Sequence, residues 1–174
     1  MKKKVFQLLV ENTSGVLSRI SGLFARRGYN IESITAGTTA DPRVTRITIV
    51  ATGDDEILEQ IEKQLAKLVD VCNIIELKPA ESVYRELALI KIECNPSERL
   101  NVIAITDTDA FQANVVDVSK NGLIIEMTAT TAKIDSFIEL ISSYKILEIA
   151  RTGIAGLRRG TDDIYWPDFD KLGM

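Results

Sequence analysis

The stretch VFQLLVENTSGVLSRISGLFARRGYNIES, residues 5–33, decides the fold of this chain. It starts with an apolar run, passes through a polar turn at residues 11–15, and continues with apolar residues at helical spacing from 16 to 24. Arg26, Arg27 and Gly28 mark the end of that helix, because basic side chains suit its last turn and glycine suits the stop. The stretch therefore predicts a strand, a turn, a helix and a second strand.

The turn at residues 11–15 also has the features of a small-ligand site. The first N–H groups of a helix have no partner inside it and lie at the positive end of its dipole, which suits a carboxylate. Asn12 in the turn and Asn30 at the start of the next strand carry amides that can bind an ammonium group. The sequence therefore predicts a site for an amino acid.

The residues that follow complete a first module. Segments 29–38 and 44–52 are rich in β-branched residues and flank a turn at Pro42, so they predict a β-hairpin. A second helix with one apolar face starts after Asp54, and residues 71–77 predict a last strand. The resulting order, βαββαβ, is that of a split-βαβ, ferredoxin-like module.

The same order recurs in the second half of the chain. Helix starts are predicted at Asn95-Pro96 with Glu98, and at Thr131 as a cap. Strands are predicted on both sides of the hairpin signal Asn121-Gly122 and at both ends of the module, at residues 85–94, 111–118, 123–129 and 146–150. The chain is thus predicted to be an α+β protein of two ferredoxin-like βαββαβ modules, residues 1–79 and 80–160, with a tail at 161–174.

Composition excludes several classes of protein. The net charge is −4, and neither module offers the basic surface that nucleic acid requires. No stretch of about 18 apolar residues is present to span a membrane. Cys72 and Cys94 lack metal-ligand spacing and lie in apolar surroundings, which favours reduced thiols and a cytoplasmic location.

The chain contains no histidine, which disfavours most forms of catalysis. A Ser-His-Asp or Cys-His site, a zinc site with imidazole ligands and a histidine acid or base are all excluded. Neither GxGxxG after a strand nor GxxxxGK[ST] is found. An autonomous enzyme is therefore the less favoured interpretation.

Several long segments, in the right order, resemble the family of small regulatory subunits of acetolactate synthase (acetohydroxyacid synthase). They are residues 12–19, 23–33, 59–71, 85–91, 147–153 and 156–160. The resemblance implies an ACT domain followed by a second ferredoxin-like domain, without a catalytic centre. It also implies that the chain binds and activates a large catalytic subunit and confers feedback inhibition by valine or another branched-chain amino acid. Thiamine diphosphate, Mg and FAD are then expected only on that catalytic subunit.

The resemblance further implies a homodimer with effector sites between paired ACT domains. There the turn of one subunit meets Asn30 and Ile31 of the other. Backbone N–H groups near Gly15, Val16 and Leu17 then bind the carboxylate, and a side chain at Gly15 would obstruct the ligand. The branched alkyl group lies against Leu17 and Ile31. The expected effector-binding residues are Asn12, Gly15, Val16, Leu17, Asn30 and Ile31.

Other interpretations remain open at the level of sequence. Asn12 or Ser14 can simply cap the helix, and Leu17 and Ile31 can belong to the core. A free-standing ACT-domain sensor acting on another target is the main functional alternative. An RNA-recognition module shares the βαββαβ order, but segment 44–52 contains no aromatic residue.

The C-terminal tail falls outside the pattern of the family. Its acidic residues alternate with Tyr165, Trp166 and Phe169, which suggests docking on a neighbouring subunit as an alternative to a frayed terminus.

Overall fold

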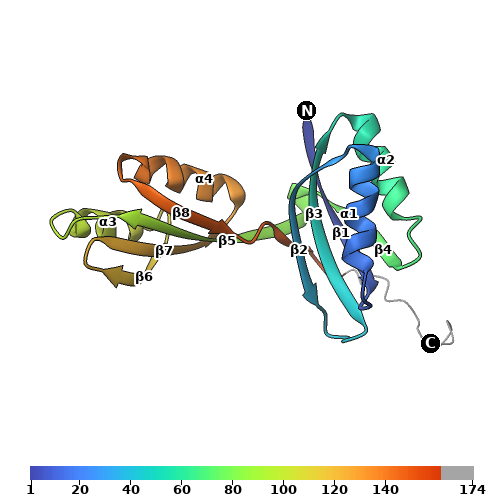
Figure 1. The fold of residues 1–174 in the computed structure, drawn as a ribbon, viewed down its shortest axis with the longest axis horizontal. Helices are drawn as coiled ribbons and strands as arrows, with labels where there is room; N and C mark the ends of the chain where they lie inside the picture. Colours follow the sequence, from blue (N-terminus) through green and yellow to red (C-terminus); the bar gives the residue numbers. More distant parts are fainter. Residues whose placement is uncertain (162–174) are drawn as a thin grey trace. The chain divides into compact units, whose positions relative to one another are not determined.

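The computed structural model describes residues 1–161, which form two units (Figure 1). Among the described residues, one unit comprises Met1–Val83 together with 156–161, and the other comprises Tyr84–Ala155. The strand from Ser82 to Glu93 therefore begins in the first unit and continues into the second. The predicted aromatic tail, with Tyr165, Trp166 and Phe169, lies outside the described residues.

The first unit has the predicted βαββαβ order. Its elements are β1 (Lys2–Glu11), α1 (Val16–Arg27), β2 (Asn30–Thr38), β3 (Val44–Gly53), α2 (Asp55–Leu65) and β4 (Val71–Leu77). The strands form an antiparallel sheet in the order β2-β3-β1-β4, and both helices cover the same face (Figure 1). Phe6, Leu8 and Val10 point to that face because side chains alternate along a strand, and they pack against Ile20 and Phe24 of α1.

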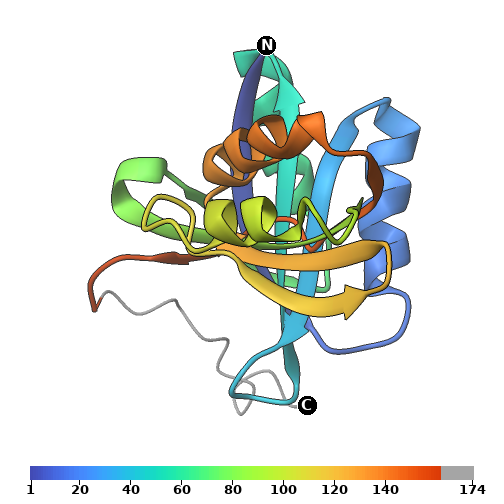
Figure 2. The same ribbon diagram turned by 90° about the vertical axis from the view of Figure 1, so that its left-hand side faces the viewer.

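The second unit repeats this arrangement. Its elements are β5 (Ser82–Glu93), α3 (Arg99–Thr106), β6 (Asn114–Ser119), β7 (Gly122–Ala129), α4 (Thr131–Leu140), η2 (Ile141–Ser143) and β8 (Ile146–Arg151). The short helix η1 (Pro79–Glu81) precedes β5 and belongs to the first unit, as does nearly all of β9 (Ala155–Arg158). The sheet order is β6-β7-β5-β8, with β9 also paired to β5. Figure 2 shows α3 and α4 on one face of this sheet, where Ile90, Ile125 and Phe137 form the centre of the core. The predicted fold class is confirmed.

Three local predictions in the second unit are wrong. The helix expected to start at Asn95-Pro96 begins at Arg99, because residues 96–98 form a turn in which the Glu98 carboxylate accepts from the N–H of Asn95. The strand expected at 111–118 begins only at Asn114, because Phe111 instead packs its ring 5.2 Å from that of Phe137, and Gln112 turns the backbone to a φ of 51°. The expected cap Thr131 is the first residue of α4, whose N-cap is Thr130. The Thr131 hydroxyl donates instead to Glu86 Oε2, at 3.0 Å.

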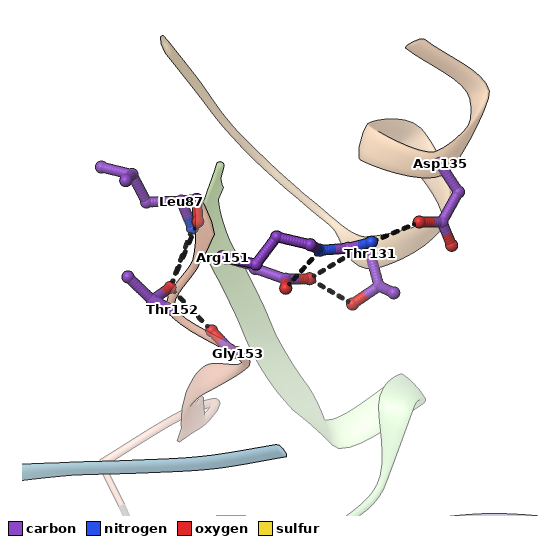
Figure 3. A network of polar contacts seen from close by, with 7 residues as sticks. Leu87, Thr131, Asp135, Arg151, Thr152 and Gly153 are labelled. Carbon is purple, nitrogen blue, oxygen red and sulfur yellow. Dashed lines mark hydrogen bonds and ion pairs between the residues drawn. The ribbon is translucent and has the colours of Figure 1, made fainter. Parts of the chain in front are cut away.

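This contact belongs to a polar network that joins β5, β8 and α4 (Figure 3). The Arg151 guanidinium donates to both carboxylate oxygens of Glu86, at 2.8 and 2.9 Å, and to Asp135 Oδ1 at 2.7 Å. Only 6% of the Glu86 side chain is exposed, so its charge needs this partner. The Arg151 hydrogen bond holds the pKa of Glu86 below its usual value, and the same bond raises the pKa of Arg151.

Across residues 1–161, no helix has the length and apolar character needed to cross a membrane. The same residues contain no cluster of three or more His, Cys, Asp or Glu side chains that could hold a metal ion.

Candidate functional site

A cavity of about 240 Å³ lies at the end of β1, where the chain turns into α1. It is lined by the polar turn, by the first residues of α1, and by Thr45 and Ile47 of β3. Drug-sized ligands occupy pockets of about 300–1,000 Å³. The smaller cavity therefore suits a ligand of the size of a single amino acid.

Gly15 is the N-cap of α1 and has a left-handed backbone, with φ 89° and ψ −8°. In the described residues no side chain caps this helix, whereas Asp54 caps α2 by accepting from the N–H of Ile57 at 2.8 Å. The alternative that Asn12 or Ser14 caps α1 is therefore wrong. The first N–H groups of α1 are left for a ligand or solvent, which is compatible with the carboxylate site predicted from the sequence.

The requirement for glycine at position 15 comes from its backbone conformation. A β-carbon there would have ordinary van der Waals contact with the Arg19 guanidinium, 3.6 Å from Nη1. The positive φ is the costly feature, because L-residues adopt it only with strain. Obstruction of the ligand, the reason expected from the sequence, is thus not needed to explain this glycine.

Asn12 anchors the turn to the β2–β3 hairpin. Its backbone N–H donates to Arg43 O at 2.7 Å, its Nδ2 donates to Pro42 O at 2.8 Å, and its Oδ1 accepts from the Thr45 hydroxyl at 3.0 Å. A side-chain amide has two N–H groups and two lone pairs on oxygen, so one donor and one acceptor position remain. The hairpin therefore orients an amide that still has capacity for a ligand.

Val16 and Leu17 differ in what they can offer. The Val16 side chain is 4% exposed and belongs to the core of the first unit, so only its backbone can serve a ligand. Leu17 is 48% exposed and lines the cavity. It can therefore contact an apolar group of a bound molecule.

Asn30 and Ile31 lie elsewhere in the same chain. Asn30 is opposite Thr52 and Ile31 is opposite Ala51, whereas the turn reaches β3 at Thr45. From Thr45 to Thr52, at about 3.3 Å per residue, the strand covers roughly 23 Å. One chain thus brings four of the six predicted residues to the cavity, and the other two lie near the far end of the sheet.

Arg19 and Asp70 support the turn, and sequence reasoning did not identify them. Arg19 Nε and Nη2 donate to the two carboxylate oxygens of Asp70, at 2.6 and 2.7 Å. The backbone oxygen of Asp70 accepts from the N–H of Glu11 at 3.0 Å. The two residues are 51 positions apart, so no local spacing could have predicted the pair.

The corresponding turn of the second unit, between β5 and α3, is arranged differently. There Glu98 precedes the helix, and its Oε2 accepts from the N–H of Asn95 at 3.1 Å. That turn therefore contains a carboxylate that accepts from its own backbone, whereas no side chain caps α1 in the described part of the first unit.

Comparison with known proteins agrees with this architecture. Residues 6–73 match the family model for an AHAS small subunit-like ACT domain, and residues 85–160 match that for the small subunit of acetolactate synthase. A probable acetolactate synthase small subunit of Methanothermobacter thermautotrophicus is 46% identical over 157 residues, which is 90% of this chain and 93% of the relative. The acetolactate synthase isozyme 3 small subunit of Escherichia coli is 43% identical over 159 residues, or 91% and 96% of the two chains.

A crystal structure of a member of the same family matches the fold of this chain. The acetolactate synthase small subunit of Thermotoga maritima matches this fold with a TM-score of 0.83 and 38% identity. The match covers 92% of this chain and 99% of that one. The resemblance noted in the sequence is thereby confirmed, and the chain belongs to the acetolactate synthase small subunit family.

Proposed function

We propose that this chain activates the thiamine-diphosphate-dependent catalytic subunit of acetolactate synthase and makes it sensitive to valine or another branched-chain amino acid. As a member of its family, the chain is a small, regulatory subunit of a transferase. Family membership favours this role over that of a free-standing ACT-domain sensor. Family membership also supports activation of the catalytic subunit, whereas effector binding and dimerisation are supported by the geometry of the first unit.

The observation that carries the proposal is the separation of Asn30 from the turn. β2 is an edge strand of its sheet, and Ile34 in its middle is 39% exposed. An exposed edge can pair with the same edge of a second copy, and a two-fold axis makes that pairing antiparallel. Antiparallel pairing of two β2 strands would carry Asn30 of one subunit to the end of the other sheet at which Thr38 and the turn lie. A homodimer thus assembles the two halves of the site.

The contacts expected in such a site follow from the chemistry of its parts. The α-carboxylate of the effector accepts from the free N–H groups at Gly15, Val16 and Leu17. Amides of Asn12 and of Asn30 from the partner subunit orient the polar groups, and the alkyl group lies against Leu17 and the partner's Ile31. Valine and isoleucine differ by one methylene, which an apolar pocket distinguishes by only about 1–3 kcal/mol. Cross-binding among branched-chain amino acids is therefore expected.

Regulation follows from linkage. An effector shared by two subunits stabilises the dimer arrangement to which it binds more tightly. It alters catalysis only to the extent that the catalytic subunit also distinguishes between the arrangements. Thiamine diphosphate, Mg and FAD belong, in this proposal, to the catalytic subunit alone.

The proposed location is the cytoplasm. Cys72 and Cys94 are free thiols, the first half-buried and the second buried. Burial raises the pKa of both, which makes them unreactive structural residues of the kind that reducing compartments tolerate.

Reconstitution tests the proposal. The catalytic subunit is assayed alone, with this chain, and with this chain plus valine, leucine or isoleucine. The proposal expects higher acetolactate formation with the chain, and a saturable decrease when at least one of the three amino acids is added. Unchanged activity on adding the chain would contradict the activating role, and activation insensitive to all three would contradict the effector role.

A further inference from the structure

The ion pair between Arg19 and Asp70 lies directly beside the turn that begins α1. The Asp70 side chain is 7% exposed, while that of Arg19 is half exposed. Both donors of Arg19 that face Asp70 make short, parallel bonds to it, at 2.6 and 2.7 Å. Such a bidentate arrangement fixes the direction of both side chains as well as their distance.

The same two residues hold the turn at both of its ends. The N–H of Arg19 donates to Gly15 O at 2.9 Å, and Arg19 Nη1 lies 3.6 Å from the position that a β-carbon on Gly15 would take. At the other end, the N–H of Glu11 donates to Asp70 O at 3.0 Å. Asp70 thus contacts the start of the turn through its backbone and, through Arg19, the end of the turn.

Local features of the turn leave its geometry dependent on such contacts. Gly15 has a positive φ, and α1 lacks a side-chain cap among the described residues. The β1–β4 pairing is also irregular between Leu9 and Val10, immediately before Glu11. An uncapped turn that follows an irregular strand pairing depends for its geometry on contacts with the rest of the unit.

We infer that Arg19 and Asp70 are positioning residues for the effector site. The ion pair holds the N–H groups of Gly15, Val16 and Leu17 in the geometry that binds a carboxylate. Asp70 also immediately precedes β4, so the pair connects the turn with the strand that leads through η1 into β5. This inference rests on the proposed function and specifies how its carboxylate subsite is built.

The test compares valine affinity in the dimeric protein, measured by calorimetry, for the wild type and three variants. Asp70→Asn removes the negative charge that pairs with Arg19, and Asp70→Glu keeps a carboxylate. The matched control is Glu59→Gln, which removes a helix-surface ion pair with Lys63 whose side chains are 63% and 65% exposed. Loss of a hydrogen bond to a charged group corresponds to an increase in Kd of about tenfold or more.

The expected result is a valine Kd raised about tenfold in Asp70→Asn, largely restored in Asp70→Glu, and unchanged in Glu59→Gln. Recovery by the carboxylate variant separates positioning from a general loss of structure. Wild-type affinity in a dimeric Asp70→Asn variant would overturn the inference.

A further variant, on the other side of the ion pair, tests the inference if Asp70→Asn does not fold. Arg19→Lys keeps the charge but loses the bidentate fork, and it should weaken valine binding several-fold; wild-type affinity in this variant would overturn the inference. The proposed function is tested separately by the wild type itself. If the wild-type chain neither binds a branched-chain amino acid nor confers inhibition in the holoenzyme, the proposed function fails before the variants are considered.

Discussion

Asn12 and Asn30 lie near opposite ends of the same β-sheet. Asn12 accepts a hydrogen bond from Thr45 near the start of β3, and Asn30 pairs with Thr52 near its end. Both amides can therefore serve one ligand only if they come from different subunits. Binding of such a ligand by both amides therefore depends on the oligomeric state of the chain.

Replacing Gly15 by alanine should destabilise the first unit. A left-handed conformation costs an L-residue about 1–2 kcal/mol, and no crowding adds to this cost. Gly22 in the middle of α1 is the matched control, because a helical alanine is better than glycine by roughly 0.5–1 kcal/mol. Urea unfolding followed by circular dichroism should thus give a lower free energy of unfolding for Gly15→Ala than for the wild type, and a higher one for Gly22→Ala. A change of the free energy of unfolding in the same direction in both variants would contradict the conformational explanation.

Placing a charge on the edge of β2 should weaken the dimer. Ile34→Lys introduces an ammonium group where two β2 strands are proposed to meet, and lysine on an edge strand opposes pairing. Sedimentation velocity over a range of concentrations should show a shift toward monomer. Leu100→Lys, on the exposed side of α3 in the second unit, serves as the control and should leave the dimer unchanged. A dimer equally stable in both variants would exclude the β2 edge as the interface.

The Glu86–Arg151 pair should make the second unit sensitive to acid. The pKa of folded Glu86 lies below its usual value, so its contribution to stability is fully present above the unfolded pKa of about 4.3. That contribution is lost as the pH falls through the lower, folded pKa. Glu86→Gln should remove it, with a loss of about 1–3 kcal/mol at pH 7.

Hydrogen exchange of β8 amides in the full chain measures this effect. After correction for the intrinsic exchange rate, amide protection in the wild type should decrease as the pH is lowered below about 5. The Glu86→Gln variant should show weak protection at every pH. Glu139→Gln, an exposed carboxylate on α4, is the control and should behave like the wild type. An equal pH response in Glu86→Gln and the wild type would show that another group causes it.

The comparison of sequence and structure separates local from long-range information. Helical spacing and β-branched runs predicted both modules, because periodicity reflects which face of each element is buried. The start of β6 was wrong because Phe111, although a good strand residue, gains more by packing on Phe137. Local patterns cannot encode such tertiary preferences.

The site shows the same division. The turn and its Gly15 were predicted from a few adjacent residues, and the structure places Asn12, Val16 and Leu17 with them at one cavity. The supporting pair of Arg19 with Asp70, and that of Glu86 with Arg151, join residues 51 and 65 positions apart. Pairs of this kind depend on the register of strands and are visible only once the sheet is assembled.

The central claim, a site shared between two subunits, is tested most directly by mixing two defective variants. Leu17→Glu places a charge in the cavity, and Asn30→Ala removes the amide that the partner supplies. Each variant alone should bind no valine at concentrations that saturate the wild type. In a mixed dimer, one of the two sites carries both substitutions and the other carries neither.

Calorimetric titration of the purified mixed dimer with valine gives the decisive result. The shared site predicts that about one of the two wild-type sites reappears per dimer, with wild-type affinity. If each site were instead built within a single chain, every site in the mixed dimer would carry one substitution, and the absence of any restored binding would contradict the account.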